Sequence, residues 1–174
     1  AETAIRYFLE GKTYDLESLR PTPDRSAVVR DQGEGEIVVN SDAAPGDIQI
    51  TADILDMVIK YYNYCTNIAA AAEVVNVEQR VRLSRVLHQG AELHGEKLQT
   101  FGTADLTALL KNDEGHTLLV CDLKTGRHLV YARKNPQLML YAAGLMKLYA
   151  TTYNITKIII SIFQPLAGAE ARSE

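Results

Sequence analysis

Residues 117–124 constrain the fold more than any other stretch of this chain. The run Leu118-Leu119-Val120-Cys121 is apolar at every position, so a strand formed there buries both of its faces. Such a strand belongs at the centre of a sheet that is covered on both sides. The run continues into Asp122-Leu123-Lys124, which puts an acid and a base on the same face of the strand. Charges at the end of a buried strand are costly unless they bind something.

Hydrophobic periodicity predicts the elements around this strand. In chain order we expect a helix over 51–73, strands over 77–84, 101–110 and 117–124, a helix over 136–151 and a strand over 157–163. Thr51 and Asn135 are suitable N-caps, and Pro136 suits the first helical position. Because a helix joins the last two strands, they are expected to be parallel. The pattern predicts an α/β fold, a sheet packed against helices.

The remaining segments are less regular. We expect a short helix over 1–10, a long irregular loop over 12–47 with a small strand at 36–39, a polar turn over 88–97, and a polar, frayed tail from Ala167. In the strand 77–84 the alternation places Val77, Gln79, Val81 and Leu83 on one face and Glu78, Arg80, Arg82 and Ser84 on the other.

Size and composition favour an ordinary globular protein. The 174 residues, 47% hydrophobic and 23% charged, predict a single domain over 1–174. No apolar run is long enough for a transmembrane helix, so no membrane partner is expected. The chain starts at Ala1 rather than Met, which we interpret as trimming, and its first residues lack the features of a signal peptide.

Cys65 and Cys121 are expected to be buried thiols in a reducing, cytoplasmic compartment. A net charge of -4 argues against a broadly basic nucleic-acid-coating protein.

Two acids and a lysine form the main candidate site. Asp105 ends the apolar part of one predicted strand, and Asp122 ends the next one across a short hairpin. Hairpin pairing brings such positions within reach of one cation, and carboxylate ligands suit Mg²⁺ or Mn²⁺. Lys124 would then orient water or stabilise negative charge on a phosphodiester. The alternative is a surface ion pair of Lys124 with either aspartate, which contributes little.

Further polar residues accompany this site. Gln137 and Tyr141 are one helical turn apart and share a face. They either contact a nucleic-acid backbone or position Lys124; alternatively, Tyr141 belongs to the core and Gln137 is its solvated neighbour. Glu73 and Glu78 are alternative third acids, and either one can also be a solvated surface residue. The four histidines, His88, His94, His116 and His128, have no zinc-like spacing and are expected to be surface or turn residues. Basic residues group in two clusters, which are either phosphate contacts or solvated loop charges: Arg80, Arg82 and Arg85, and Lys124, Arg127, Arg133 and Lys134.

These motifs, in this order, resemble the PD-(D/E)XK nuclease superfamily. The resemblance rests on Gly102-Thr103-Ala104-Asp105, Asp122-Leu123-Lys124-Thr125-Gly126 and Asn135-Pro136-Gln137-Leu138-Met139-Leu140-Tyr141. Residues 77–81 and 160–165 add to it, and it spans about residues 73–165. The most similar branch is that of the RecB-like and lambda-exonuclease-like nucleases, including phage and prophage proteins.

The resemblance implies a fold, a site and a role. It implies a restriction-endonuclease-like α/β core with a mixed central sheet flanked by helices. Asp105 and Asp122 would bind Mg²⁺ or Mn²⁺, Lys124 would be the catalytic lysine, and Gln137 and Tyr141 would match the QxxxY helix that contributes to the site and to DNA contacts. The third acid would be Glu78 by the strand match or Glu73 by its place near the helix end. The implied role is phage DNA processing or recombination in the cytoplasm of a bacterial host, and ring-forming relatives add a homo-oligomer as an open alternative.

Three hypotheses follow. The first is a Mg²⁺- or Mn²⁺-dependent deoxyribonuclease, an exonuclease acting on DNA ends. The second is a nuclease-like DNA-binding or partner-binding module without catalysis, because relatives usually carry a histidine on a helix near their start and none precedes His88 here. The third is an unrelated α/β protein whose acids are surface charges. Digestion of linear and closed circular DNA with and without metal separates them.

Overall fold

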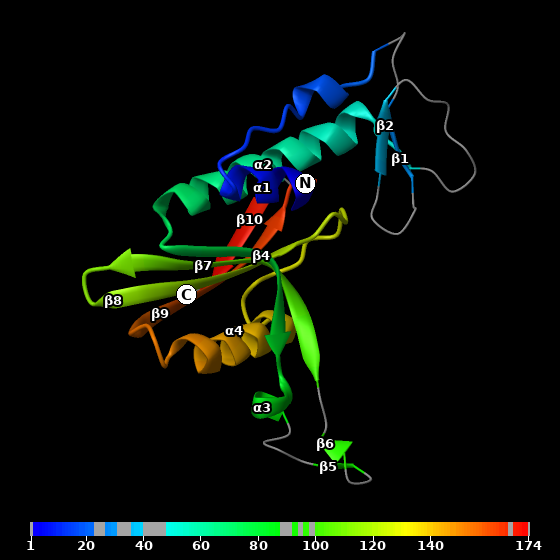
Figure 1. Ribbon diagram of the computed structural model, residues 1–174. Coiled ribbons are helices and arrows are strands. Elements are labelled where there is room, and N and C mark those ends of the chain that lie inside the picture. Colours follow the sequence, from blue (N-terminus) through cyan, green and yellow to red (C-terminus); the bar gives the residue numbers. More distant parts are fainter. Residues whose placement is uncertain are drawn as a thin grey trace. The chain divides into compact units, whose positions relative to one another are not determined.

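The computed structural model describes residues 2–22, 27–30, 36–39, 48–87, 92–93, 96–97, 100–166 and 169–173 (Figure 1). The chain divides into two compact units, residues 1–64 and 65–174. Each unit has its own cluster of buried apolar side chains. That the whole chain acts as one nuclease-like domain stays a prediction.

The first unit combines helices with a small antiparallel sheet. It holds α1 (Glu2–Leu9), the 3-10 helix η1 (Glu17–Leu19), β1 (Ala27–Arg30), β2 (Glu36–Val39), β3 (Ile48–Gln49) and the larger part of α2 (Ala52–Ala71). The strand order is β2-β1-β3. The first helix and the strand at 36–39 were predicted, whereas β1, β3 and η1 lie in or beside a stretch expected to be irregular. Runs of two to four residues carry too little periodicity to be recognised. Thr51 is the N-cap of α2 as predicted, accepting from Ile54 N at 3.3 Å.

The second unit is built on a five-stranded mixed sheet. Its elements are β4 (Val74–Arg82), α3 (Ser84–Leu87), β5 (Glu92–Leu93), β6 (Glu96–Lys97), β7 (Phe101–Asn112), β8 (Gly115–Leu123), α4 (Pro136–Tyr149), β9 (Ile155–Gln164) and β10 (Ala169–Ser173). The strand order is β10-β9-β8-β7-β4, in which β8 and β9 are parallel and all other neighbours antiparallel. The central place of β8 and its parallel pairing with β9 confirm two predictions. The class, α/β with a mixed sheet and flanking helices, is also as expected.

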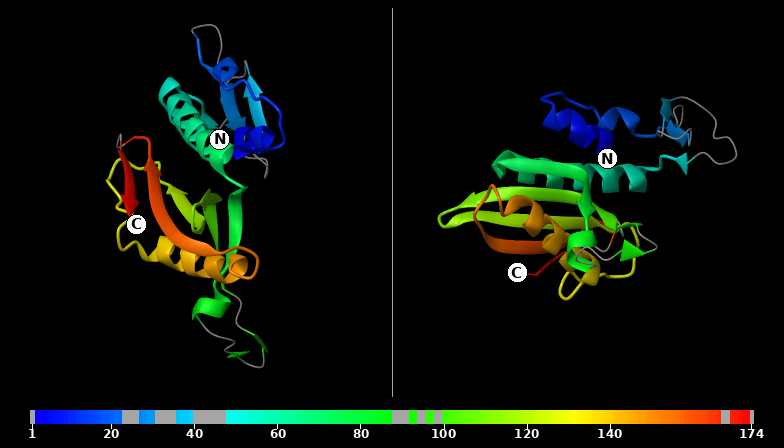
Figure 2. Two further views of the ribbon diagram at one scale, coloured as in Figure 1. Left: turned by 90° about the vertical axis from the view of Figure 1, so that its left-hand side faces the viewer. Right: turned by 60° about the horizontal axis from the view of Figure 1, so that its bottom comes forward.

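Helix α4 covers one face of this sheet, as both views in Figure 2 show. Asn135 caps it by accepting from Leu138 N at 3.2 Å, and Pro136 occupies the first turn, as predicted. Leu138 and Leu145 are at most 1% exposed and pack with residues of the central strands, among them Val120. Fully burying one such side chain stabilises the fold by about 1.5–3 kcal/mol. The sheet and α4 thus form a firm base for polar groups at the strand ends.

Two predictions about the second unit were wrong. The tail was expected to fray, but Ala169–Ser173 forms β10 and pairs antiparallel with β9. Backbone hydrogen bonds make this ladder, so a polar sequence does not prevent it. The segment 88–97 was expected to be a simple turn; within it the short strands β5 and β6 pair antiparallel, while His88 and His94 lie outside the described residues.

The expected burial of both cysteines is confirmed. Cys65 and Cys121 are both buried free thiols. Among the helices that the structure describes, none is both long and apolar enough to cross a membrane.

Candidate active site

The site lies where two neighbouring strands separate. The ladder between β7 and β8 runs from Asn112 and Gly115 to Leu106 and Cys121 and ends there. The next pair in this register would be Asp105 and Asp122. The ladder between β7 and β4 continues beyond this point to Phe101, and Figure 1 shows β4 and β7 curving away from β8. The fork places the two predicted acids side by side at the end of the β7–β8 ladder.

Asp105 is half-buried and held by the backbone of the neighbouring strand. Its Oδ2 accepts a hydrogen bond from the Leu123 amide at 2.6 Å. Burial raises the pKa of the Asp105 carboxyl above its ordinary value of 3.8, the Leu123 hydrogen bond opposes this rise, the nearby Asp122 adds to it and Lys124 opposes it. The structure therefore couples all three predicted residues electrostatically, and it leaves the Asp105 charge poorly compensated.

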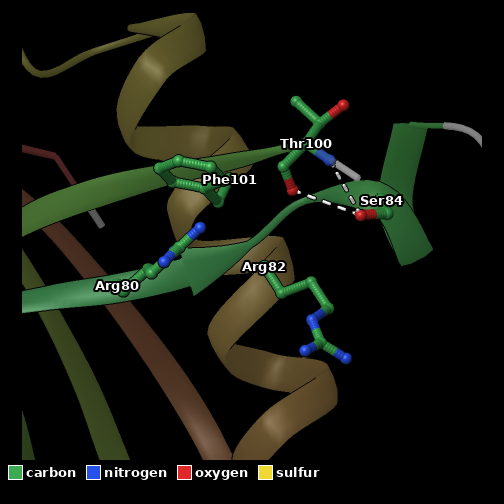
Figure 3. A pocket seen from close by; sticks show the side chains of 5 residues that line it. All are labelled: Arg80, Arg82, Ser84, Thr100 and Phe101. Carbon is green, nitrogen blue, oxygen red and sulfur yellow. Dashed lines mark hydrogen bonds between the residues drawn. The ribbon is translucent and has the colours of Figure 1, made fainter. Parts of the chain in front are cut away.

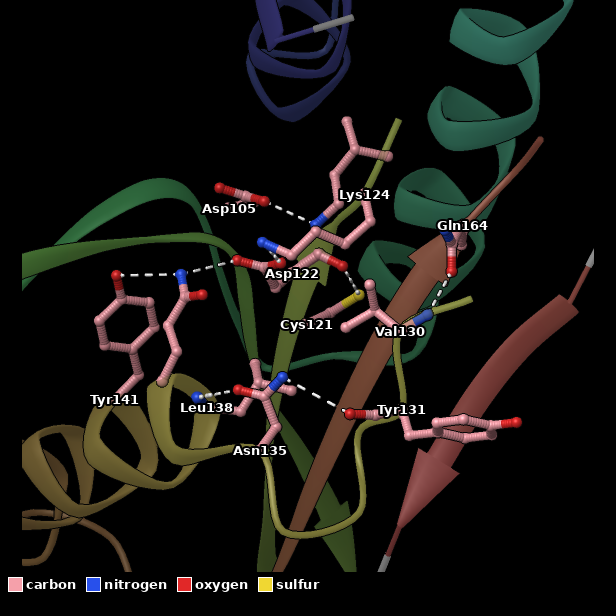
Figure 4. Close-up of polar contacts among 12 residues, drawn as sticks. Asp105, Cys121, Asp122, Lys124, Val130, Tyr131, Asn135, Leu138, Tyr141 and Gln164 are labelled. Carbon is pink, nitrogen blue, oxygen red and sulfur yellow. Dashed lines mark hydrogen bonds and ion pairs between the residues drawn. The ribbon is translucent and has the colours of Figure 1, made fainter. Parts of the chain in front are cut away.

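Asp122 and Lys124 form an ion pair at the same fork (Figure 4). Asp122 is only 3% exposed, and Lys124 Nζ lies 2.5 Å from its Oδ2. Within the described part of the chain, this Oδ2 is buried without a hydrogen bond of normal geometry, so the ammonium contact is an ion pair alone. A buried carboxylate oxygen that lacks hydrogen-bond donors is stabilised by a neighbouring positive charge, which Lys124 supplies here.

Gln137 and Tyr141 join the site from α4, as the sequence predicts. The Gln137 amide donates to Asp122 Oδ1 at 3.0 Å and to the Tyr141 hydroxyl at 3.3 Å. Tyr141 in turn lies against the backbone of β7, because a Cβ at Gly102 would overlap its ring. Gln137 therefore fixes the Asp122 carboxylate, and Tyr141 orients Gln137 rather than serving the core alone.

Glu78 stands at a break in β4. Its φ is 50°, in the left-handed region that a non-glycine residue rarely adopts. On either side of it, Asn76 and Gln79 both donate to the Tyr149 hydroxyl at 3.0 Å, although a regular strand would point residues three apart to opposite faces. The predicted alternation is therefore wrong before Glu78: Val77 does not share the face of Gln79.

The structure distinguishes between the two candidates for a third acid. Glu78 is exposed and lies opposite Asp105 in register, since Val77 pairs with Leu106 and Gln79 with Ala104. Glu73 instead contacts His116 Nε2 at 2.9 Å. Since His116 is six residues before Asp122 on β8, this contact is about 20 Å from the site. Glu73 is thus removed from the candidates, and His116 is a partly buried strand residue rather than the surface or turn residue expected.

The donor set fits a hard divalent cation. The described residues contain no group of three or more His, Cys, Asp or Glu side chains placed to hold a metal ion, so Glu78 does not join the two aspartates there. Mg²⁺ is commonly bound through one or two carboxylates, with water and substrate phosphate oxygens filling its other positions. Asp105 and Asp122 would be the two carboxylates of such a site, and Asp122 Oδ2 faces the Lys124 ammonium in the structure.

Sequence reasoning assigned no role to the residue that supports the loop between β8 and α4. Gln164, only 2% exposed, accepts from Val130 N at 3.0 Å and donates to the carbonyls of Gly126 at 2.7 Å and His128 at 2.6 Å. The sequence holds one sign of this role. Gln164 is a polar residue in a β-branched strand, at the fourth position of the face that Ile158, Ile160 and Ile162 occupy. Through Gln164 the strand β9 shapes the loop that follows Lys124.

A family model covers most of the chain. It matches residues 25–172, which include the fork, the loop and α4, and its description is "Protein of unknown function (DUF2800)". The chain therefore belongs to the DUF2800 family.

Proposed function

We propose that this chain is a Mg²⁺- or Mn²⁺-dependent deoxyribonuclease of the PD-(D/E)XK type, an exonuclease that acts on DNA ends in phage DNA processing or recombination. The observation that carries the proposal is the convergence of Asp105, Asp122 and Lys124 at the fork between β7 and β8. Two acids and a lysine at one strand end, with a glutamine and a tyrosine behind them, agree with the resemblance noted in the sequence. The cytoplasm of a bacterial host is the proposed location, consistent with two buried free thiols.

The residues of the site have distinct tasks in this reaction. The two carboxylates would hold a divalent cation, which when bound would neutralise charge at the scissile phosphate and lower the pKa of a bound water. Lys124, about one-third exposed, presents a positive charge beside Asp122, where a phosphate oxygen that gains negative charge is stabilised. Gln137 keeps the Asp122 carboxylate in one orientation through Oδ1. The Leu123 amide does the same for Asp105.

The loop between β8 and α4 supports DNA as the substrate. Arg127, Arg133 and Lys134 are exposed on it, and Tyr131 is 66% exposed. Cations bind phosphates without regard to sequence, and exposed aromatic rings stack on unpaired bases. The loop starts at Lys124 itself, so a strand bound along it would pass the two aspartates.

A DNA-binding module without catalysis is the alternative. It is favoured by the absence of a third acid gathered with the aspartates in the described part of the chain and by the ion pair that already occupies Asp122 Oδ2. Such a module would bind DNA and leave it intact with every metal.

The test is digestion of end-labelled linear DNA and closed circular DNA with Mg²⁺, with Mn²⁺ and with a chelator. We expect degradation of the linear form only, and only with metal. Asp122→Asn keeps an acceptor for Gln137 but removes the charge, and it should lower the rate on the order of 100-fold or more, as for the loss of a group that stabilises transition-state charge.

Asp113→Asn is the matched control, because Asp113 is an exposed acid on the β7–β8 turn. It should retain full activity. Equal activity of Asp122→Asn and the wild type would refute the assignment, and binding without cleavage under every metal condition would favour the module.

A further inference from the structure

A second polar site lies on the arm formed by the ends of β4 and β7. A pocket of about 280 Å³ is lined by Arg80, Arg82, Ser84, Thr100 and Phe101 (Figure 3). A neighbouring pocket of about 360 Å³ shares both arginines and adds Lys147 of α4. Three cations thus border one recessed surface, which favours an anionic ligand.

The two arginines are available to such a ligand. Among the described residues neither guanidinium forms an ion pair. The Arg80 guanidinium carbon lies 3.5 Å from the centre of the Phe101 ring, a stacked arrangement that holds the group in place and leaves its in-plane N–H donors free to bind. Figure 3 shows the Arg82 guanidinium pointing away from this stack.

At one end of the pocket, two hydrogen bonds join Ser84, the first residue of α3, to Thr100, the residue before β7. Ser84 Oγ accepts from Thr100 N at 3.0 Å and donates to Thr100 O at 3.3 Å. Because its hydroxyl is used here, Ser84 shapes the pocket rather than binding the ligand. The charged groups therefore decide which ligand fits.

The arm connects this pocket to the candidate active site. Arg80 and Arg82 pair with Thr103 and Phe101 of β7, and Asp105 follows Phe101 by four residues on the same strand, about 13 Å. This length equals the axial rise of about four nucleotides on one strand of a duplex. The two arginines are themselves about 7 Å apart along β4, so they reach different phosphates of one backbone.

We propose that Arg80 and Arg82, with Arg80 stacked on Phe101, form a phosphate-binding track that holds the DNA strand a few nucleotides away from the scissile bond. The inference rests on the proposed function, since it names how that same substrate is held. The ligand is the sugar–phosphate backbone of DNA, bound without base contacts. Such a track increases affinity and aligns the strand, while the chemistry stays at the fork.

The test measures binding of a fluorescent DNA duplex with a single-stranded end, in Ca²⁺ or a chelator so that binding is separated from cleavage. Arg80→Gln combined with Arg82→Gln should weaken binding on the order of 100-fold or more, as expected for two charged hydrogen-bonding groups. The slope of log affinity against log salt should become shallower by about 1.4 to 1.8, because two phosphate contacts are lost. Cleavage at saturating DNA should be unchanged, so the loss appears in KM and not in kcat.

Lys111→Gln is the matched control, since Lys111 is an exposed cation at the opposite end of β7. It should leave affinity and salt slope as in the wild type. Unchanged binding by the double arginine variant, in an enzyme that cleaves DNA, would overturn the track while the proposed function stands. Arginine-dependent binding by a chain that never cleaves would support the track and reject the nuclease.

Discussion

At the scale of single residues, Asp105 shows how the site balances stability against function. Its carboxyl is half-buried, and its pKa is raised chiefly by that burial, with only one hydrogen bond from Leu123 and the charge of Lys124 opposing the rise. The ionised form, which a metal ligand needs, is therefore less favoured here than in an exposed carboxyl. Asn can accept the same hydrogen bond from Leu123 without carrying the charge.

The raised pKa predicts a pH-dependent difference between the wild type and Asp105→Asn. A carboxyl whose folded-state pKa lies above its unfolded value contributes stability that is complete below pH 3.8 and is lost as pH rises through the folded pKa. The variant lacks this loss, so its free energy of unfolding should exceed that of the wild type by an amount that grows from acid to neutral pH. Denaturant titrations in a chelator, repeated across that range, measure the difference.

Asp113→Asn controls for the removal of any acid, since it lies on an exposed turn. The difference in the free energy of unfolding between Asp113→Asn and the wild type should not grow with pH in this way. A difference for Asp105→Asn that shrinks toward neutral pH would mean that the sign of the pKa shift is wrong.

At the scale of elements, β9 supports the loop between β8 and α4. One buried side chain, Gln164, satisfies three backbone groups of that loop, at Gly126, His128 and Val130. Buried amide and carbonyl groups must find partners, so this one residue fixes the path of the exposed cations. Lys134, with φ of 60°, takes the strained backbone that turns the loop into the N-cap of α4.

Gln164→Leu should make the loop between β8 and α4 more mobile. The change leaves three polar backbone groups without their partner, at a cost of about 1–3 kcal/mol for each that stays buried. We expect a lower melting temperature and faster hydrogen exchange at Val130, while amides in the middle of β8 remain protected. Gln164→Glu keeps the acceptor for Val130 and loses both donors, so it should preserve the Val130 protection in part. Equal exchange at Val130 in Gln164→Leu and the wild type would contradict this role.

Sequence periodicity predicted the long elements and their pairing, because each long element carries its own pattern. The apolar run of β8 indicated a central strand, and the helix after Asn135 made β9 parallel to it. The break at Glu78 could not be predicted, since its left-handed backbone depends on Asn76 and Gln79 both reaching Tyr149 from another element. Two site residues, Asp105 and Asp122, followed from hairpin register. The Leu123 amide and Gln164 did not, because Leu123 acts through its own backbone and Gln164 bonds only to backbone groups of a loop.

At the scale of the whole molecule, charge is unevenly distributed. The chain carries a net charge of -4, yet exposed cations of the second unit flank its two aspartates: Arg80, Arg82, Arg127, Arg133 and Lys134. An acidic chain with a local basic surface excludes most nonspecific anion binding while it concentrates a strand at one place.

Metal binding should stabilise the entire fold. A ligand that binds only the folded state raises its stability by mass action, by about 2.7 kcal/mol at a concentration one hundred times the Kd. Mn²⁺ should therefore raise the melting temperature of the wild type, and excess chelator should reverse the shift. Asp105→Asn and Asp122→Asn should lose most of this response, whereas Asp113→Asn should keep it. The same shift in all four proteins would show that the metal acts elsewhere.

The hydrogen bond from Leu123 to Asp105 has a bearing on which sequences can share this arrangement. Its donor is a peptide nitrogen, which every amino acid except proline provides. The hydrogen bond that holds Asp105 therefore does not depend on which side chain stands at the middle position of the Asp-x-Lys triplet. That side chain has only to satisfy packing. Diverged homologues can therefore carry any residue except proline at this position and still hold the aspartate that corresponds to Asp105 in place.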